Sequence, residues 1–365
     1  MEAYGYDANG NRTLKTSTEA GVEAESATYT AGDQLEGRDD TTYDYDANGR
    51  LSGKVEETDA GPAVTTYVYG SQGQLLQVDT PDTSIEYRHN ALGQRVAKLI
   101  DGDIVERYLW QDLTTLLATY DGSGNLKQRF QYTAGHTPTS FTQSGQRYYI
   151  QTDHLGSPRA VTDSSGTVVK EIRYDSYGNI INDSNPEFQI PFGFAGGLHD
   201  ADTGLVRFGF RDYDPEAGRW TARDPIGFDG GDTNLYGYVL NNPISFYDLD
   251  GLELSSVDQA AVAVVSDRHF TSTYNREVGG RVLQSWINSD SISTTTVVGQ
   301  ERSVYVMDAP IKLFHSTVAT FHVHPDGEVG NYFSQEDIWN AESRLLPTYV
   351  SGDSRILKYD PVILP

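Results

Sequence analysis

A short unit that joins a tyrosine to an Asp-x-x-Gly turn recurs along the first half of the chain. Its best copies begin at Tyr6, Tyr45, Tyr120 and Tyr174, and weaker ones at Tyr69 and Tyr87. Aspartate can hydrogen-bond the backbone of a turn and glycine accepts a positive φ, so each copy predicts a β-hairpin with tyrosine on the entering strand. One copy would fit any antiparallel sheet, but copies recurring every 20 to 40 residues or so indicate stacked units. The sequence therefore predicts a mainly β fold.

Composition excludes several kinds of protein. The formal net charge is −25, and a phosphate backbone would be repelled by most of such a surface, which disfavours a nuclease. The chain has no cysteine, so it has no disulfide, and any metal site must use histidine and carboxylate ligands. No apolar run is long enough to span a membrane, and the first residues lack the pattern of a cleaved signal peptide.

The repeats in residues 1–147 resemble the YD repeats of Rhs and teneurin-like proteins, a family whose long antiparallel sheet winds into a hollow shell. The stretch 148–252 is similar to the Rhs-associated core. The motifs that carry this second resemblance are Asp153-His154-Leu155-Gly156, Phe192-Gly193-Phe194-Ala195-Gly196, Arg211-Asp212-Tyr213-Asp214-Pro215, Gly218-Arg219-Trp220, Asn234-Leu235-Tyr236 and Asn241-Asn242-Pro243. The resemblance implies a bacterial polymorphic toxin, made in the cytoplasm and exported by a dedicated secretion system, with a cognate immunity protein as a partner.

Two aspartate-containing turns, 223–227 and 248–252, lie near the end of the core-like stretch. Either turn alone is typical of an ordinary aspartate-capped loop. Their resemblance to the Rhs core implies an aspartyl autoprotease that cuts after Leu252, with Asp224 and Asp248 as the dyad and Arg223 helping to hold charge. Hydrolysis by two carboxylates requires one to be protonated and the other ionised. The second turn departs from the family because Leu249 stands where proline is usual.

Residues 253–365 are expected to form a small α/β domain. A capped amphipathic helix is predicted for 255–268 and a second helix for 334–346, with strands at 302–307 and 317–323.

A candidate metal site lies in this last segment. On a strand, His322 and His324 point to the same face, and the loop after Pro325 is short enough to return Asp337 to them. Two histidines and one aspartate leave the fourth position of a tetrahedral zinc ion for water, as in catalytic sites. The alternative is an exposed strand followed by an ordinary helix cap formed by Ser334 and Asp337.

The pattern His-x-His-Pro…Ser-x-x-Asp resembles that of JAMM (JAB/MPN-type) metalloproteases. The resemblance implies that His322, His324 and Asp337 bind zinc and that Ser334 supports the oxyanion. It also requires an upstream glutamate as general base, for which Glu277 is the best match. Glu301 and Glu328 remain alternatives.

Two classes of function stay open for the tail. One is a zinc-dependent peptidase or isopeptidase that acts on a protein or peptide substrate after release by self-cleavage. The other is a JAB-like binding or plug module without turnover. An unrelated toxin such as an ADP-ribosyltransferase has no supporting motif.

Overall fold

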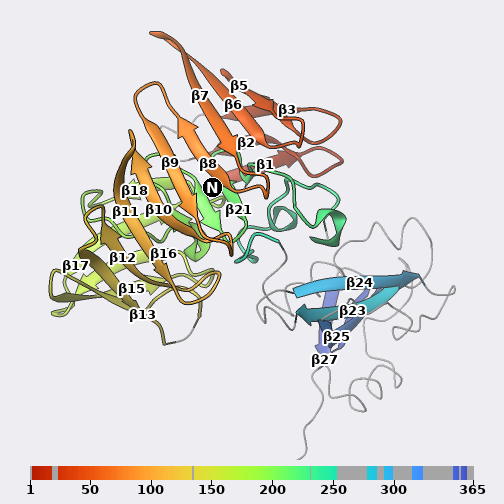
Figure 1. Cartoon of the computed structure of the whole chain (residues 1–365). Helices are drawn as coiled ribbons and strands as arrows, with labels where there is room; N and C mark the ends of the chain where they lie inside the picture. The colour runs from red at the N-terminus through yellow and green to blue at the C-terminus, as the bar shows by residue number, and fades with distance from the viewer. Residues whose placement is uncertain are drawn as a thin grey trace, which may run out of the picture. The chain divides into compact units, whose positions relative to one another are not determined.

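The computed structural model describes residues 2–18, 24–133, 135–230 and 232–252, together with the backbone of five strands between residues 278 and 359 (Figure 1). The chain divides into two compact units. The first unit contains residues 1–228 and 232–252, and the second contains residues 229–231 and 253–365.

The first unit is built on a long antiparallel meander, in which each strand pairs with the next along the chain. Its eighteen described strands are β1 (Glu2–Tyr6), β2 (Arg12–Ser17), β3 (Glu25–Tyr29), β4 (Leu35–Arg38), β5 (Thr41–Tyr45), β6 (Leu51–Thr58), β7 (Gly61–Tyr69), β8 (Leu75–Asp79), β9 (Ser84–His89), β10 (Arg95–Ile100), β11 (Asp103–Trp110), β12 (Leu116–Asp121), β13 (Leu126–Gln131), β14 (Ser140–Gln143), β15 (Gln146–Thr152), β16 (Pro158–Asp163), β17 (Val168–Tyr174) and β18 (Ile180–Asp183). The segment boundary expected after residue 147 falls inside β15, so the repeats and the start of the core form one continuous sheet. The mainly β fold class is confirmed.

The repeated Asp-x-x-Gly unit forms the hairpin turns that the sequence predicts. At the second copy, Asp46 Oδ1 accepts hydrogen bonds from the backbone N–H groups of Asn48 (2.8 Å) and Arg50 (2.9 Å). The last residue of the turn, Gly49, has a φ of 75°, and its N–H donates to the Asp46 carbonyl. Asp7, Asp163 and Asp175 make the same pair of side-chain contacts in their own turns. Each turn therefore satisfies its own backbone with one carboxylate.

A second, small sheet follows the meander and carries an aromatic core. Its strands are β19 (Leu198–His199), β20 (Val206–Phe208), β21 (Arg211–Asp214) and β22 (Arg219–Trp220), accompanied by the 3₁₀ turns η1 (Phe194–Gly196), η2 (Gly227–Gly230) and η3 (Val239–Asn241). Phe208, Tyr213, Trp220 and Tyr238 are each at most 1% exposed. The ring centroids of Tyr213 and Tyr238 lie 4.4 Å apart, and those of Trp220 and Tyr238 lie 5.4 Å apart. Burial of these large rings makes this cluster a main source of stability.

The large sheet packs on the segment that contains this small sheet. Leu205 joins the buried side chains of Leu75 and Ile85 from β8 and β9, and Ala217 joins a second cluster with Leu35 from β4. Backbone contacts add to the packing, since the Leu51 N–H donates to the carbonyl of Thr221 at 2.8 Å. Residues 205–222 therefore connect strands that lie far apart along the chain.

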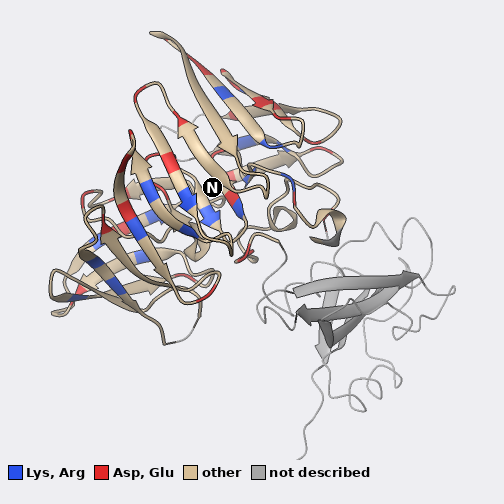
Figure 2. Ribbon diagram, viewed as in Figure 1, with Lys and Arg blue, Asp and Glu red and all other residues tan. Residues whose placement is uncertain are grey.

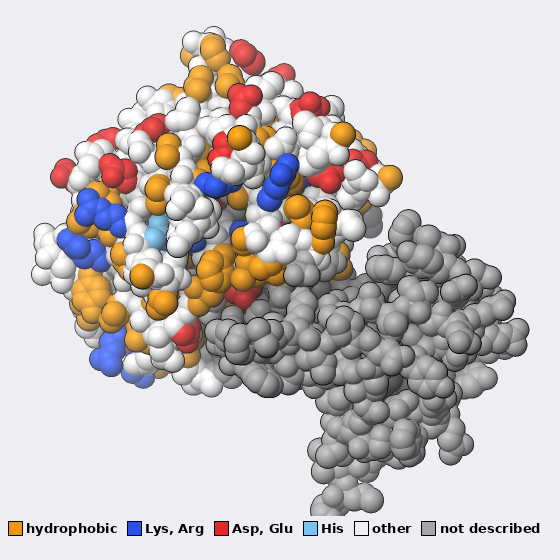
Figure 3. Space-filling view, turned by 45° about the vertical axis from the view of Figure 1, so that its right-hand side comes forward, with side chains coloured by type: hydrophobic (Ala, Val, Ile, Leu, Met, Phe, Trp, Pro, Cys, Tyr) orange, Lys and Arg blue, Asp and Glu red, His pale blue; other side chains and the backbone are white. Residues whose placement is uncertain are grey.

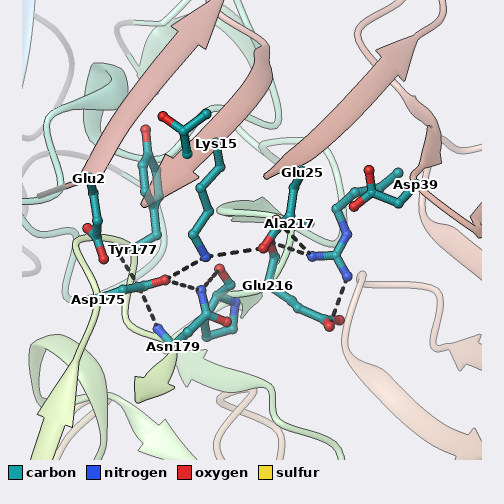
Figure 4. A network of polar contacts seen from close by, with 12 residues as sticks. Glu2, Lys15, Glu25, Asp39, Asp175, Tyr177, Asn179, Glu216 and Ala217 are labelled. Carbon is teal, nitrogen blue, oxygen red and sulfur yellow. Dashed lines mark hydrogen bonds and ion pairs between the residues drawn. The ribbon is translucent and has the colours of Figure 1, made fainter. Parts of the chain in front are cut away.

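Side chains also tie the first strands of the meander to the turn that follows β17 (Figure 4). Lys15 Nζ on β2 lies 3.0 Å from Asp175 Oδ2, and both side chains are nearly inaccessible to solvent. Glu2 on β1 accepts hydrogen bonds from the N–H and hydroxyl of Ser176. From β4, Arg38 pairs with Glu25 and with Glu216 in the loop after β21. Polar contacts therefore join the beginning and the end of the meander.

The surface of the first unit mixes apolar, acidic and basic side chains. Figure 2 shows many of the acidic residues in turns and at strand ends, where the repeated aspartates lie. In the face shown in Figure 3, basic side chains are interspersed with acidic and apolar ones. Among the residues that the structure describes, no helix has the length and apolar character needed to cross a membrane.

The second unit contains a five-stranded sheet in the order β24-β23-β25-β26-β27. Its strands are β23 (Val278–Ser285), β24 (Ile292–Val298), β25 (His315–Val323), β26 (Thr348–Gly352) and β27 (Arg355–Tyr359). The strand predicted for 317–323 is confirmed because it lies within β25. The helices predicted for 255–268 and 334–346 and the strand predicted for 302–307 fall outside the described residues.

Candidate active site

The structure brings Asp224 and Asp248 to one buried guanidinium group. Arg211 Nη2, on β21, lies 2.9 Å from Asp224 Oδ2 and 3.3 Å from Asp248 Oδ2. The three side chains are between 5% and 8% exposed. Arg211 is therefore the shared cation of the two carboxylates proposed from the sequence.

Each aspartate is fixed by the turn that contains it. Asp224 Oδ1 accepts the Ile226 N–H at 2.9 Å, and the Asp224 N–H donates to the carbonyl of Leu235 at the same distance. Asp248 Oδ1 accepts the N–H groups of Gly251 at 2.8 Å and Leu252 at 3.2 Å. These turns leave the Oδ2 atom of each carboxylate facing the guanidinium of Arg211.

Arg211 itself is held by an aromatic ring and by the peptide backbone. Its guanidinium carbon lies 4.2 Å from the ring centroid of Trp220, and its Nε donates a hydrogen bond to the carbonyl oxygen of Gly251. One side chain therefore contacts both carboxylates and the peptide group that joins Gly251 to Leu252. That group directly precedes the peptide bond expected to be cut.

A third carboxylate, that of Asp250, lies at the same place. Asp250 is 4% exposed, and its Oδ1 accepts the Leu252 N–H at 3.1 Å. Its backbone carbonyl accepts the Phe210 N–H at 2.8 Å, which fixes the turn against the segment that enters β21. The Leu252 N–H is thus shared between Asp248 and Asp250.

Burial raises the pKa of both dyad members, but more strongly for Asp248 than for Asp224. Burial raises the pKa of Asp248 well above its ordinary value, and the negative charge of Asp250 raises it further, against the opposing effect of Arg211. Burial also raises the pKa of Asp224, while Arg211 and the Ile226 N–H act to lower it. The two carboxyl groups thus have unequal environments, which favours one protonated and one ionised member.

The arginine selected from the sequence lies elsewhere. Arg223 is exposed, and its Nε donates to the Tyr236 hydroxyl at 3.2 Å, beside the turn residue Gly49. We expected Arg223 to hold charge at the dyad, but in the structure the arginine that contacts both aspartates is Arg211. Sequence reasoning missed Arg211 and Asp250, although both belong to motifs noted above. The sequence feature that could have identified Arg211 is its position at the start of a strand with a buried aromatic residue, Tyr213.

The candidate residues of the tail are only partly described. His322 lies in β25, where its backbone is the register partner of Gly279 on β23 and of Val350 on β26. The other candidates fall outside the described residues, namely Glu277, Glu301, His324, Glu328, Ser334 and Asp337. Among the side chains that are described, no group of three potential metal ligands occurs. The zinc site therefore stays a prediction.

Comparison with known proteins gives consistent relatives. The Teneurin YD-shell family model matches residues 1–244. Teneurin-3 of Danio rerio is 34% identical over 256 residues, which cover 67% of this chain and 9% of that protein. The probable deoxyribonuclease RhsB of Dickeya dadantii is 33% identical over 255 residues, covering 63% of this chain and 17% of RhsB. The chain thus spans a small part of the length of these relatives.

A crystal structure of TcdB2-TccC3-TEV matches 69% of this chain and 17% of its own chain, with 20% identity and a TM-score of 0.41. The match of the family model over two thirds of the sequence agrees with the meander, its aspartate turns and the aromatic segment that follows them. The chain belongs to the Teneurin YD-shell family.

Proposed function

We propose that the first unit cleaves its own chain between Leu252 and Glu253. The observation that carries this proposal is the convergence of Asp224 and Asp248 on Arg211, beside the backbone of Gly251 and Leu252. Two carboxylates with different proton affinities next to a peptide are the groups that acid–base hydrolysis requires.

The proposed reaction uses one water molecule and one proton from the site. Asp224, ionised beside Arg211, takes a proton from the water as its oxygen attacks the carbonyl carbon of Leu252. Asp248 gives its proton to the nitrogen of Glu253 as the C–N bond breaks. The products are a new carboxyl terminus at Leu252 and a new amino terminus at Glu253. Afterwards Asp224 holds a proton and Asp248 is ionised.

Arg211 acts as a positioning residue in this scheme. Its hydrogen bond to the Gly251 carbonyl and its two ion pairs hold the peptide and both carboxylates in one arrangement. Stacking on Trp220 limits the freedom of the guanidinium. Leu249, where the family commonly has proline, is buried and so contributes packing to the second turn.

The test is intact-mass analysis of the purified 40.3 kDa chain and its Asp224→Asn and Asp248→Asn variants. We expect the wild-type chain to yield a fragment that begins at Glu253, and both variants to stay intact. Asp214→Asn is the matched control, because Asp214 also accepts backbone N–H groups in a turn, and its described hydrogen bonds are to Glu216 and Ala217 rather than to the dyad. A wild-type chain without that fragment, or cleavage that persists in Asp248→Asn, would refute the proposal.

For the tail we propose a zinc-dependent peptidase or isopeptidase with a protein or peptide substrate. The supporting observation is the register of β23 and β25, in which Val278 pairs with Val323. In the sequence Glu277 directly precedes Val278, and His324 directly follows Val323. Glu277 and His324 are therefore each one residue along the chain from a member of the paired positions Val278 and Val323. On this proposal Glu277 is the general base, Ser334 supports the oxyanion, and His322, His324 and Asp337 hold the metal.

Metal analysis distinguishes this proposal from a binding or plug module. We expect about one zinc ion per chain by the stoichiometry of a single catalytic site. The content should fall in a His322→Ala/His324→Ala variant and stay unchanged in His315→Ala, which alters another histidine of β25. Zinc absent from the wild-type protein would reject the peptidase and favour the module.

The wider role follows the same proposals. Self-cleavage would release the tail as an effector, exported by a dedicated secretion system and countered by an immunity protein. The name of RhsB assigns a deoxyribonuclease activity to that protein. For this chain the net charge of −25 disfavours a nucleic-acid substrate.

A further inference from the structure

Asp248 and Asp250 converge on a single backbone N–H group. The Oδ1 atoms of both side chains accept the Leu252 N–H, at 3.2 and 3.1 Å. Both residues are 4% exposed, so water screens the repulsion between their negative charges only weakly. Two carboxylates directed at one donor in a buried turn form a pair that strongly resists double ionisation.

One arginine, two further aspartates and one tyrosine lie around this pair of carboxylates. Arg211 faces Asp248 from β21, and Asp224 faces the same guanidinium from the preceding turn. Burial raises the pKa of Tyr238 well above its ordinary value, so this phenol stays neutral. Asp232 also feels the charge of Arg211, and burial raises its pKa. At the centre of the site Arg211 thus pairs with two carboxylates, with Asp250 beside them, and a proton bound to Asp248 relieves part of the negative charge.

We infer that Asp250 is a third functional carboxylate of this site, which keeps the proton on Asp248 and thereby sets the alkaline limit of self-cleavage. The inference deepens the proposed self-cleavage and rests on it. Asp250 does not exchange a proton with the peptide in this scheme. Its negative charge makes ionisation of Asp248 unfavourable, so that the general acid stays loaded at higher pH.

A purely structural role for Asp250 makes a different prediction. The side chain also closes its turn by accepting the Leu252 N–H, and an asparagine can accept that hydrogen bond in the same way. Asp250→Asn therefore removes the negative charge and keeps the acceptor. A turn residue would tolerate this change at every pH, whereas a residue that holds the proton on Asp248 would not.

The first experiment measures the pH profile of cleavage. Full-length chain is purified in denaturant, refolded into buffers from acidic to alkaline, and followed by mass spectrometry for the fragment that begins at Glu253. In Asp250→Asn we expect the alkaline limb to move to lower pH by about one unit, a roughly tenfold slower reaction on that limb, with little change on the acidic side. Asp214→Asn should retain the wild-type profile.

An unchanged alkaline limb in Asp250→Asn would overturn the inference. Loss of cleavage at every pH in a folded Asp250→Asn chain would also overturn it, because that result would give Asp250 a direct part in the reaction. Cleavage that fails in the wild-type chain or persists in Asp248→Asn instead refutes the proposed function.

A second measurement does not depend on cleavage. The chain used is Asp224→Asn, which is not cleaved on the proposed mechanism. The infrared difference spectrum between this chain and Asp224→Asn/Asp248→Asn reports the protonated carboxyl group of Asp248. We expect its carbonyl band at neutral pH, and we expect the band to be lost at lower pH when Asp250→Asn is added. A band that titrates at the same pH with and without Asp250→Asn would overturn the inference.

Discussion

The residues of the candidate site show how burial changes ordinary acid–base behaviour. The pKa of Asp248 is raised well above its ordinary value because the ionised form is buried and lies beside the carboxylate of Asp250. Arg211 offsets part of that effect for both dyad members through one nitrogen atom. The chemistry of the site therefore depends on a cation that neither aspartate motif contains.

Removal of that cation should be strongly destabilising. In an Asp248→Asn chain, Arg211→Met leaves the carboxylate of Asp224 buried without its cation, and we expect a loss of about 3–5 kcal/mol in the free energy of unfolding. Arg223→Met is the matched control, since Arg223 is exposed, and its loss should stay below about 1 kcal/mol. Urea unfolding of both variants in an Asp248→Asn chain, which keeps Asp224 and is not cleaved on the proposed mechanism, measures the difference. Equal losses would show that Arg211 does not stabilise the carboxylates.

The raised pKa of Asp248 also predicts how stability depends on pH. The unfolded chain releases this proton near the ordinary aspartate pKa, while the folded chain retains it. The folded state therefore loses stability as pH rises from that value toward the folded pKa, by at most about 1.4 kcal/mol per pH unit. Asp248→Asn removes this loss. We therefore expect the free energy of unfolding of Asp224→Asn/Asp248→Asn to exceed that of Asp224→Asn by more as the pH rises. A difference that does not change with pH would contradict the raised pKa of Asp248.

At the scale of elements, the meander repeats the same aspartate–glycine turn between successive strands. Each hairpin needs a backbone that reverses direction, and the aspartate and glycine of the unit provide it without help from other strands. Some turns have a second role, because residues of the later segment pack on them. The Tyr236 hydroxyl donates to the Gly49 carbonyl at 2.6 Å, whereas no atom of the described residues lies within 4 Å of where a side chain at Gly124 would begin.

Glycine-to-alanine variants separate these two kinds of turn. Both Gly49 and Gly124 have positive φ, so alanine costs about 1–2 kcal/mol at either position from backbone strain. At Gly49 the added methyl group would also lie 2.5 Å from Arg223 Nε and 2.7 Å from the Tyr236 hydroxyl. We expect Gly49→Ala to lower the urea midpoint clearly more than Gly124→Ala. Equal shifts would mean that the later segment yields easily at this turn.

These local rules explain what could be predicted from the sequence. The hairpin turns follow from contacts within five residues, so the repeated motif was sufficient to place them. The site depends on Arg211, which reaches Asp248 only after β21 has packed beside the final turn. No local pattern reveals which of several arginines meets the dyad, and the motif therefore favoured the neighbouring Arg223. Asp250 was overlooked because a turn aspartate is ordinary until its burial is known.

At the scale of the whole first unit, polar contacts link strands from opposite ends of the meander. Lys15 and Asp175 form an ion pair whose side chains are 8% and 4% exposed, and the Tyr6 and Tyr177 hydroxyls lie 2.6 Å apart. A buried pair of this kind gives little net stability, but loss of one partner leaves an uncompensated charge. These contacts therefore govern whether β1 and β2 stay attached to the later turn.

Hydrogen exchange can test this link. In Lys15→Met we expect the backbone amides of β1 and β2 to exchange faster, while those of β8–β10 keep their rates, because the latter strands pack on Leu205. Lys127→Met is the control, since Lys127 pairs with Glu106 at a more exposed position. A uniform increase over the whole unit would show that the pair supports global rather than local stability.

The self-contained turns also bear on how such a chain changes over evolutionary time. A hairpin whose turn glycine has no other described residue near it, such as that between β16 and β17, can be lengthened, shortened or duplicated, and its neighbours keep their pairing. A hairpin whose turn receives Tyr236 or Arg223 has no such freedom, because an insertion there would displace the aromatic segment. Length variation among descendants of this sequence should therefore gather at turns such as Asp163–Gly166 and avoid Asp46–Gly49.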